Sequence, residues 1–345
     1  MTKQENKIPI KGYNSWDPLK HVWIGSGFKS EWIKYLVKNQ KIYDPLCKIA
    51  DETEEDYQKL DSILKQAGVQ THRTWLDIDK YNTFEHMGRH KPPMTPRDLF
   101  ATVGDKFYVG GGPNTYQGYL SMLNHIDRKN IQMDPHAPFA VSTATLVRVG
   151  KDLWWDLRDD QRDTDEKRAF IQKMTTLWES KGFRVHYTYR GYHSDGSFCI
   201  VKPGAIISLH DVQDYKENFP DWEVCYLPDQ SWSLISPFLD IKDKVDGKWW
   251  VQGEEKNNDL THFINTWLND WVGYVEETVF DVNMLSIDEN HVIVSSYNKT
   301  VFDFLKKHKV EPIICNWRHR YFWDGGIHCI TQDFYREGEM EDYFG

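Results

Sequence analysis

The sequence predicts an α/β fold in which ββαβ units repeat around a ring. Three observations carry this prediction: four similar strand–turn–strand segments, amphipathic helices that lead into further strands, and strand-like segments near both ends of the chain. Units of this kind bury their apolar faces against their neighbours, so the repeats belong to one structure. We expect a single domain over residues 1–345.

The four similar segments are predicted to be hairpins. Each has β-branched and aromatic residues on both sides of a short polar turn, and the turn residues are ones that tight hairpins favour. The turns are Gly104-Asp105, Gly150-Lys151, Pro203-Gly204 and Glu289-Asn290.

Three segments place apolar residues on one helical face, at 54–67, 165–181 and 301–309. The first two are followed by Gly68 and Gly182, which suit the end of a helix, and then by a strand-like run. The third leads into a strand-like run without a glycine. Each helix therefore connects a hairpin to a further strand.

A fifth unit can be assembled from the two ends of the chain. Residues 21–25 and 329–334 are both strand-like, and their pairing would close the ring and remove an exposed sheet edge. The first positions of the five units would then converge on the axis, where polar side chains are costly unless they serve a ligand. These positions are Asp98, Thr145, Asp195, Asn283 and Cys329.

A tryptophan-rich stretch at 240–275 is predicted to be an insertion between units, partly helical around residues 261–271. Two interpretations are open: an aromatic lid over the site, or tryptophans packed for stability.

Composition excludes several classes of protein. The net charge of -10 argues against a nucleic-acid partner, and no apolar run approaches the roughly 20 residues of a membrane span. The first residues lack the apolar stretch of a signal peptide, so we expect a cytoplasmic protein. Small molecules are the expected partners.

Neither a disulfide framework nor a metal site is predicted. The five cysteines are scattered, without a C-x-x-C pair. His86 and His90 have helical spacing but no evident third ligand.

Cys329 is the candidate nucleophile. It follows the pair Gly325-Gly326, and glycines allow the close backbone approach that would aim a thiol at a ligand. A buried, inert cysteine is the alternative for this position.

His193, Asp195 and Asp98 suit a guanidinium substrate. His193 and Asp195 are two residues apart and would share one face of an extended segment, while Asp98 adds a second acid. Carboxylates bind guanidinium and hold its carbon beside a sulfur nucleophile, and the bound cation favours the thiolate. His193 would protonate the departing amine.

These segments resemble the glycine amidinotransferase family and, more distantly, the arginine deiminases. The resemblance spans most of the chain and rests on 13–19, 96–98, 148–152, His193-Ser194-Asp195 and 325–329. It implies the five-bladed α/β propeller of the pentein type, no cofactor, and a homodimer. It also implies transfer of the amidino group of arginine through a cysteine to an amine, with release of ornithine.

Carried over by position, Cys329 is the nucleophile, His193 the acid and base, and Asp98 with Asp195 the guanidinium clamps. We further expect substrate contacts from Arg97, Asn283, Thr145 and Gly326.

The chain departs from the family pattern at several positions. A third family acid falls on Thr145, for which Asp156 is a candidate substitute. The family arginine that engages the substrate carboxylate falls on Val212, for which Arg318 and Arg320 are candidate replacements, although solvated surface arginines are the alternative. Two small hydroxyl residues of the family are replaced by Glu276 and Glu277, which would favour a cationic acceptor.

The leading hypothesis is an arginine-dependent amidinotransferase whose acceptor need not be glycine. Hydrolysis of the same intermediate, as in a deiminase or dihydrolase, is the second hypothesis. A propeller that binds guanidino compounds without turnover is the third, and it is motivated by Thr145.

Overall fold

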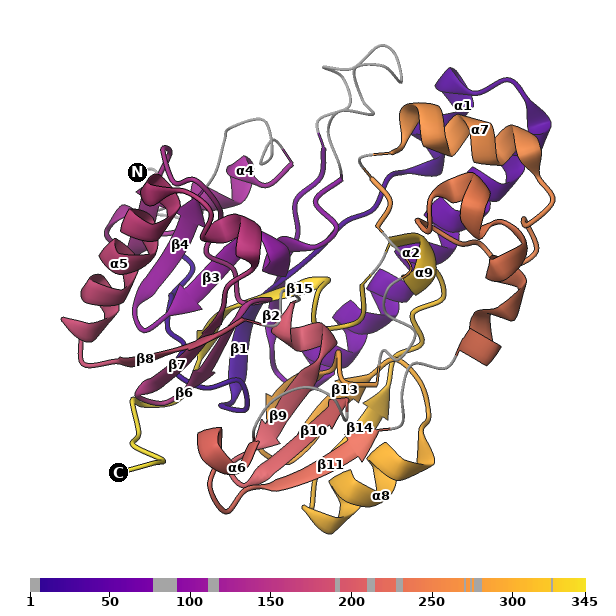
Figure 1. Cartoon of the computed structure of the whole chain (residues 1–345). Helices are drawn as coiled ribbons and strands as arrows, with labels where there is room; N and C mark the ends of the chain where they lie inside the picture. The colour runs from indigo at the N-terminus through magenta and orange to yellow at the C-terminus, as the bar shows by residue number, and fades with distance from the viewer. Residues whose placement is uncertain are drawn as a thin grey trace, which may run out of the picture.

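The computed structural model describes residues 7–76, 92–110, 118–189, 193–209, 215–227, 232–269, 271–273, 275, 281–323 and 325–345. Within these residues the strands form five three-stranded sheets. In each sheet an antiparallel hairpin is extended by a third strand that runs parallel to its neighbour. The repeating unit predicted from the sequence is therefore confirmed, in the predicted number of copies (Figure 1).

The strands follow the order of the units along the chain. The first four complete units contain β3 (Phe100–Val103), β4 (Lys106–Gly110) and β5 (Ile131–Asp134); β6 (Leu146–Val149), β7 (Asp152–Asp156) and β8 (Arg184–Thr188); β9 (Phe198–Lys202), β10 (Ala205–Leu209) and β11 (Glu223–Leu227); and β12 (Leu285–Asp288), β13 (His291–Val294) and β14 (Glu311–Ile314). The fifth sheet combines β15 (Thr331–Arg336), β1 (Leu19–Ile24) and β2 (Gln70–His72).

The fifth sheet joins the two ends of the chain, as predicted. Strands β1 and β15 pair antiparallel, with Ile24 opposite Thr331. Strand β15 also contacts β3, and β1 contacts β12, so this sheet touches the units on both sides of it. The pairing of distant segments thus links the first complete unit to the last.

Helices connect each hairpin to its third strand. They are α1 (Ser30–Leu36) and α2 (Gln40–Gln66); α4 (Leu120–Leu123); α5 (Asp165–Glu179); α6 (Tyr215–Asn218); and α8 (Lys299–Lys307). Short 3₁₀ turns are η2 (Pro96–Asp98), η4 (Arg128–Asn130), η5 (Asp159–Gln161) and η6 (Ser194–Gly196).

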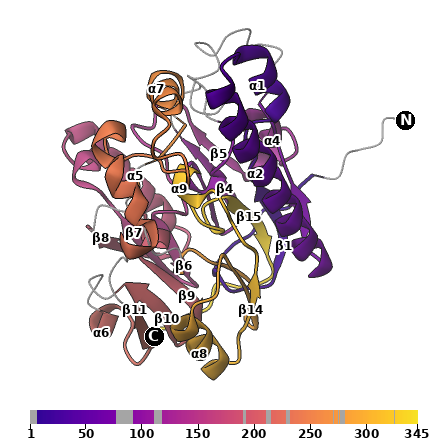
Figure 2. The same cartoon turned by 90° about the vertical axis from the view of Figure 1, so that its right-hand side faces the viewer.

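Helix α2 begins 14 residues earlier than the sequence pattern predicted. Asn39 caps it by accepting a hydrogen bond from the backbone of Lys41, and Pro45 lies inside it. A proline within a helix removes one backbone hydrogen bond and usually marks a helix boundary, so the sequence did not indicate a helix on both sides of Pro45. In the view of Figure 2, α2 runs alongside the sheet of β1 and β15.

Helix α8 is followed by Lys309, which adopts the positive φ that a glycine adopts after α2 and α5. Gly68 and Gly182 have φ of 79° and 91°, and Lys309 after α8 has φ of 58°. All three lie in the left-handed region, which costs a residue with a Cβ about 1–2 kcal/mol. The reversal after each helix is therefore shared by the three units.

The tryptophan-rich insertion packs against helix α2. It follows η7 (Trp232–Asp240) and contains η8 (Lys242–Val245) and α7 (Asn258–Trp267), so its helix starts and ends earlier than predicted. The side chain of Asn257 donates to the backbone oxygen of Lys41, and Asn39 donates to Asp259. These bonds fix the insertion to the beginning of α2.

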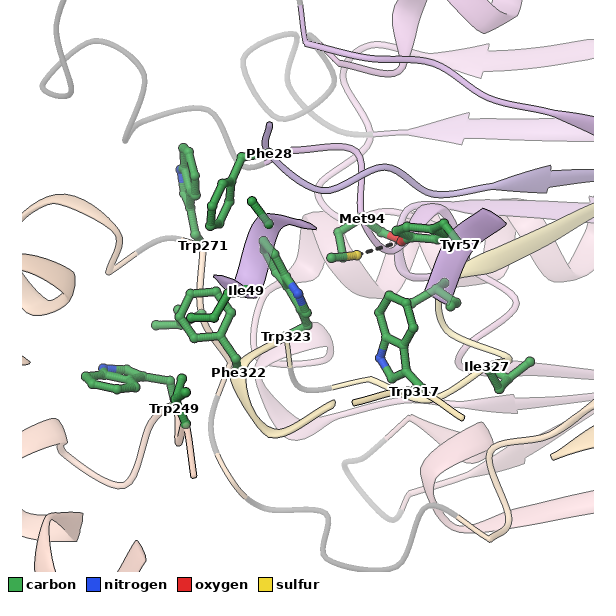
Figure 3. Close-up of a cluster of buried hydrophobic side chains, with 14 of the residues drawn as sticks. Phe28, Ile49, Tyr57, Met94, Trp249, Trp271, Trp317, Phe322, Trp323 and Ile327 are labelled. Atoms are coloured by element: carbon green, nitrogen blue, oxygen red, sulfur yellow. Dashed lines mark hydrogen bonds between the residues drawn. The ribbon is translucent and has the colours of Figure 1, made fainter. Parts of the chain in front are cut away.

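Most tryptophans of the insertion are buried in the core. Trp249, Trp250 and Trp271 belong to one apolar cluster with Phe28 and Trp323, and Figure 3 shows Trp271, Phe28 and Trp323 close together. The packing interpretation is therefore confirmed for these three tryptophans. The cluster includes the short helix α9 (Arg320–Trp323), which precedes Cys329 in the chain.

No helix among the described residues combines the length and apolar composition needed to cross a membrane.

Candidate active site

Cys329 lies in the turn immediately before β15, with only 3% of its surface exposed. The turn approaches Asn283 so closely that a Cβ on Gly326 would lie 2.5 Å from the Oδ1 atom of Asn283. A side chain at position 326 would therefore displace Asn283. The glycine serves the close backbone approach predicted from the sequence, and a contact between Gly326 and substrate stays a prediction.

Asn283 holds the turn that carries Cys329, here called the nucleophile turn (residues 326–329), through both the oxygen and the nitrogen of its side-chain amide. Its Oδ1 accepts hydrogen bonds from the backbone N–H of His328 at 2.9 Å and of Cys329 at 3.2 Å. Its Nδ2 donates to the Sγ of Cys329 at 2.9 Å and to the backbone oxygen of Asp195 at 3.1 Å. Asn283 is fully buried and positions the thiol through these bonds, and a contact between Asn283 and substrate stays a prediction.

Asp195 brings a carboxylate next to the thiol. Its Oδ2 lies 3.4 Å from the Sγ of Cys329 and 2.7 Å from the Nδ1 of His328. Its Oδ1 is buried and has no hydrogen-bond partner among the described residues. A buried carboxylate oxygen without a donor is an acceptor for a cationic ligand such as guanidinium.

The charge state of this pair follows from its surroundings. Burial alone would raise the pKa of Asp195, but the hydrogen bond from His328 and the charges of nearby basic groups together outweigh it, so the pKa lies below its ordinary value. Burial, and then the charge of Arg97, lowers the pKa of His328 to about 4. At neutral pH Asp195 is therefore an anion and His328 a neutral donor.

His193 lies on the more exposed side of the same residues. Its Nδ1 is 3.7 Å from the Oδ1 of Asp98, and 39% of its side chain is exposed. Each of these two residues sits at a short 3₁₀ turn before a hairpin, His193 at the cap of η6 and Asp98 at the end of η2. The expectation of an extended segment at 193–195 is wrong, because the turn directs His193 toward Asp98 and Asp195 toward Cys329.

Arg97 supports the nucleophile turn from the core. It is 1% exposed, and its Nε donates to the backbone oxygens of His328 and Thr331, both at 2.8 Å. Its other nitrogens donate to Thr143 and to Asp333. These bonds hold the guanidinium in the core, and a contact between Arg97 and substrate stays a prediction.

Behind Arg97 lies a buried ionic cluster. Arg97, Arg148 and Arg336 all contact the carboxylate of Asp333, at 3.0, 2.5 and 3.3 Å. Burial would raise the pKa of Asp333, but the three guanidinium groups hold it well below its ordinary value. The cluster joins the units that carry η2, β6 and β15.

A cavity of about 40 Å³ lies between the site and this cluster, enough for about one water molecule. Asp195, His328, Arg97 and Arg148 are among its lining residues. No group of three or more histidine, cysteine, aspartate or glutamate side chains that would hold a metal occurs in the described part of the chain.

Sequence and structure comparisons place this geometry among known proteins. No family model matches the chain. The mitochondrial glycine amidinotransferase of Xenopus tropicalis is 21% identical over 400 residues, which cover 98% of this chain and 85% of the relative. A solved amidinotransferase of Microseira wollei, from saxitoxin biosynthesis, has a TM-score of 0.66 and 19% identity over 97% of this chain and 100% of its own. The chain is therefore similar in sequence, over nearly its whole length, to a glycine amidinotransferase, and it shares the fold of a solved amidinotransferase.

A hydrolase shares the same fold. A solved dimethylarginine dimethylaminohydrolase superposes with a TM-score of 0.56 and 12% identity, over 92% of this chain and 100% of its own. At this identity the likeness shows the fold alone. Together with the five sheets, these structures confirm the pentein-type α/β propeller predicted for the chain.

Thr145 occupies the position of an acid in the amidinotransferase pattern, and its hydroxyl is bonded within the local turn. Its hydroxyl donates to the backbone oxygen of Ser142 at 3.2 Å, and its backbone oxygen accepts from the N–H of Asp156 at 2.8 Å. Among the described residues, the carboxylate that lies near His193 is that of Asp98, the expected guanidinium clamp, at 3.7 Å. Substrate contact by Thr145 stays a prediction.

The candidate replacement for the amidinotransferase arginine is already paired. Arg318 contacts Asp56 and Glu55 of α2, both at 2.8 Å, and its backbone N–H also donates to Asp56. Arg320 lies over the ring of Tyr321, 5.3 Å from its centre. Arg318 therefore fixes the segment before Cys329 to α2 and corrects the expectation that it replaces a substrate ligand.

Several predicted positions lie outside the described residues, namely Val212, Glu276, Glu277, His86 and His90.

Sequence reasoning missed His328 as a member of the site. In the sequence His328 is the immediate neighbour of Cys329, and a histidine next to a candidate nucleophile is itself a signal. Its partner Asp195 lies 133 residues away, and only the fold brings the two together.

Proposed function

We propose that the protein is an amidinotransferase that moves the amidino group of arginine through Cys329 to an amine acceptor and releases ornithine. The observation that carries the proposal is the position of the Cys329 sulfur, 2.9 Å from an amide donor and 3.4 Å from a carboxylate oxygen. An N–H donor favours the thiolate, and the carboxylate favours a cation beside it. A guanidinium has the charge and the planar donors that match this pair.

In the first half of the reaction the Cys329 thiolate attacks the guanidino carbon. A carbon–sulfur bond forms, and the bond from that carbon to the Nε nitrogen of arginine breaks. His193 gives its proton to the departing nitrogen, so the side-chain amine of ornithine leaves neutral and the amidino group stays on the sulfur as a cation. Asp98 lies beside His193 and balances its positive charge before the transfer.

In the second half an amine takes the place of ornithine. Its nitrogen attacks the amidino carbon, His193 accepts a proton from it, and the carbon–sulfur bond breaks to return the Cys329 thiolate. The product is a new guanidino compound. The acceptor need not be glycine.

Hydrolysis is the second candidate function, and the fold shared with a dimethylarginine dimethylaminohydrolase favours it. In the deiminase form of this reaction the Cys329 thiolate attacks the same carbon but a terminal nitrogen leaves as ammonia, so the intermediate keeps the ornithine nitrogen and water then releases citrulline and the thiolate. Water attack on the amidino-cysteine left after ornithine has departed would instead release urea. The choice depends on which carbon–nitrogen bond breaks first and on whether an amine or water attacks the intermediate.

The test is an incubation of the protein with arginine, alone and with a panel of amines that includes α-amino acids, diamines and aminocyclitols. Ornithine released in proportion to a new guanidino compound supports transfer, whereas citrulline without ornithine contradicts it. Cys329→Ala is expected to abolish the reaction. Cys225→Ala, which alters a thiol of β11 in another apolar cluster, is the matched control and is expected to retain it.

A further inference from the structure

The imidazole of His328 is held in one orientation beside the nucleophile. Its backbone N–H donates to Asn283, and its backbone oxygen accepts from Arg97 and from the hydroxyl of Thr331. With both sides of the residue fixed, Nδ1 points at the Oδ2 of Asp195, 2.7 Å away.

The partner atom determines which nitrogen carries the proton. An ionised carboxylate only accepts hydrogen bonds, so the Nδ1 of His328 must be the protonated nitrogen. Burial and the charge of Arg97 disfavour a second proton on the ring, whereas Asp195 and Asp333 favour it. The first two effects are stronger, so the pKa of His328 is lowered to about 4. The imidazole is therefore a neutral donor over the range in which enzymes of this kind operate.

The two oxygens of Asp195 have different surroundings. Oδ2 is shared between His328 and the Sγ of Cys329. Oδ1 is buried and has no partner among the described residues. Any other rotation of the carboxylate would break the bond to His328, so this bond fixes the orientation in which the second oxygen is left without a donor from the described part of the chain.

We propose that His328 is a positioning residue, which donates its Nδ1 proton to Oδ2 of Asp195 and thereby presents Oδ1 to the guanidinium of the substrate. The inference rests on the proposed function for the identity of that substrate. His193 and His328 then have separate roles. His193, which is 39% exposed, transfers protons, and His328 keeps its proton and orients the carboxylate.

Substitution separates this role from simple packing. His328→Ala removes the donor and is expected to lower kcat/KM for arginine about 10- to 100-fold, the range for a hydrogen bond to a charged group. His328→Asn places an amide N–H near the position of Nδ1 and is expected to restore most of that loss. His186→Asn is the matched control, since His186 pairs with Asp152 outside the site.

The pH profile gives a readout that packing alone would not move. The bond from His328 keeps the pKa of Asp195 low, together with the charges of His193 and Arg97. In His328→Ala the pKa of Asp195 rises, so the acid limb of kcat/KM shifts to higher pH. In His328→Asn the limb stays near that of the unsubstituted protein.

Two kinetic results would overturn the proposal. One is an unchanged kcat/KM and acid limb in His328→Ala. The other is an equal loss in His328→Ala and His328→Asn with no shift of the acid limb, which would assign the residue to packing.

A measurement without substrate keeps this test separate from that of the proposed function. In protein labelled with ¹⁵N at histidine, the His328 signal, identified by its absence in His328→Asn, is expected to report a neutral, Nδ1-protonated ring from about pH 5.5 to 8. A ring protonated at Nε2, or one that titrates near the ordinary value of about 6.5, contradicts the proposal. Failure to release ornithine or citrulline, with the expected signal present, would instead reject only the proposed function.

Discussion

The side chain of Asn283 donates a hydrogen bond to the Sγ of Cys329 at 2.9 Å, although the two residues are 46 positions apart. The same amide accepts from the backbone N–H of Cys329. One buried side chain therefore sets both the direction of the thiol and the path of the turn that carries it.

The first prediction concerns this amide. Asn283→Asp keeps the shape of the side chain but replaces the Nδ2 donor by a charged oxygen next to the sulfur. We expect kcat/KM to fall at least about 100-fold, because a lost donor and an added negative charge both disfavour the thiolate. The matched control is Asn290→Asp in the exposed turn between β12 and β13, which adds the same charge and is expected to retain activity. Activity near that of the control would contradict the assigned role.

Asp98 provides the second prediction. Asp98→Asn removes the charge 3.7 Å from the Nδ1 of His193 and one of the two proposed guanidinium contacts. We expect KM for arginine to rise about 10- to 100-fold, with a further fall in kcat. Steady-state kinetics over a range of arginine concentrations measure both. Asp105→Asn, in the exposed turn that follows β3, is the control, and an unchanged KM in Asp98→Asn would remove Asp98 from the site.

The third prediction concerns the buried ionic cluster and its pH dependence. Asp333→Asn leaves three buried guanidinium groups without their shared carboxylate, and we expect a loss of about 3–5 kcal/mol in the free energy of unfolding at pH 7. The pKa of Asp333 is depressed in the folded chain, so its stabilisation is complete above the ordinary pKa and is lost as the pH falls below it.

Urea unfolding between about pH 5 and 3 measures this effect. The unsubstituted protein is expected to lose stability on acidification more steeply than Asp333→Asn. Asp342→Asn is the control, because the pKa of Asp342 is lowered to about 2 by Arg184 at the surface, where solvent screens the pair. Parallel pH curves for Asp333→Asn and the unsubstituted protein would show that the cluster carries no such linkage.

The fourth prediction tests the reassignment of Arg318. Arg318→Ala breaks the contacts with Asp56 and Glu55, so the melting temperature is expected to fall. KM for arginine is expected to stay within about a factor of two, because the guanidinium is paired with α2. Arg320→Ala is the control for a neighbouring arginine. A large rise in KM with an unchanged melting temperature would return Arg318 to the substrate.

The repeat architecture was predictable because its signals are local. A hairpin needs turn residues at one place, such as Gly150-Lys151, and alternating side chains around it, and all of these lie within a dozen residues. The closure of the ring was also predictable, because β1 and β15 are strand-like by themselves and would otherwise leave open edges.

The positions of the charged core residues were not predictable in the same way. Arg97 adjoins Asp98 in the sequence, and we expected it to contact the substrate. Charged residues are seldom fully buried, so nothing in the sequence indicated that Arg97 lies in the core. Its burial depends on Asp333, which lies 236 residues away and also pairs with two further arginines. The role of His328 was missed for the same reason, since it depends on where the distant residue Asp195 lies in the fold. For Gly326 the sequence predicted a close backbone approach but not that its neighbour would be Asn283.

The most direct test of the account is the identity of the covalent intermediate. Protein mixed with arginine, quenched in acid within the first turnover and digested, is expected to yield the Cys329 peptide with the added mass of one amidino group. Addition of an amine acceptor before the quench is expected to remove that mass. Turnover of arginine with an unmodified Cys329 peptide, and with the rate retained in Cys329→Ala, would contradict the central claim.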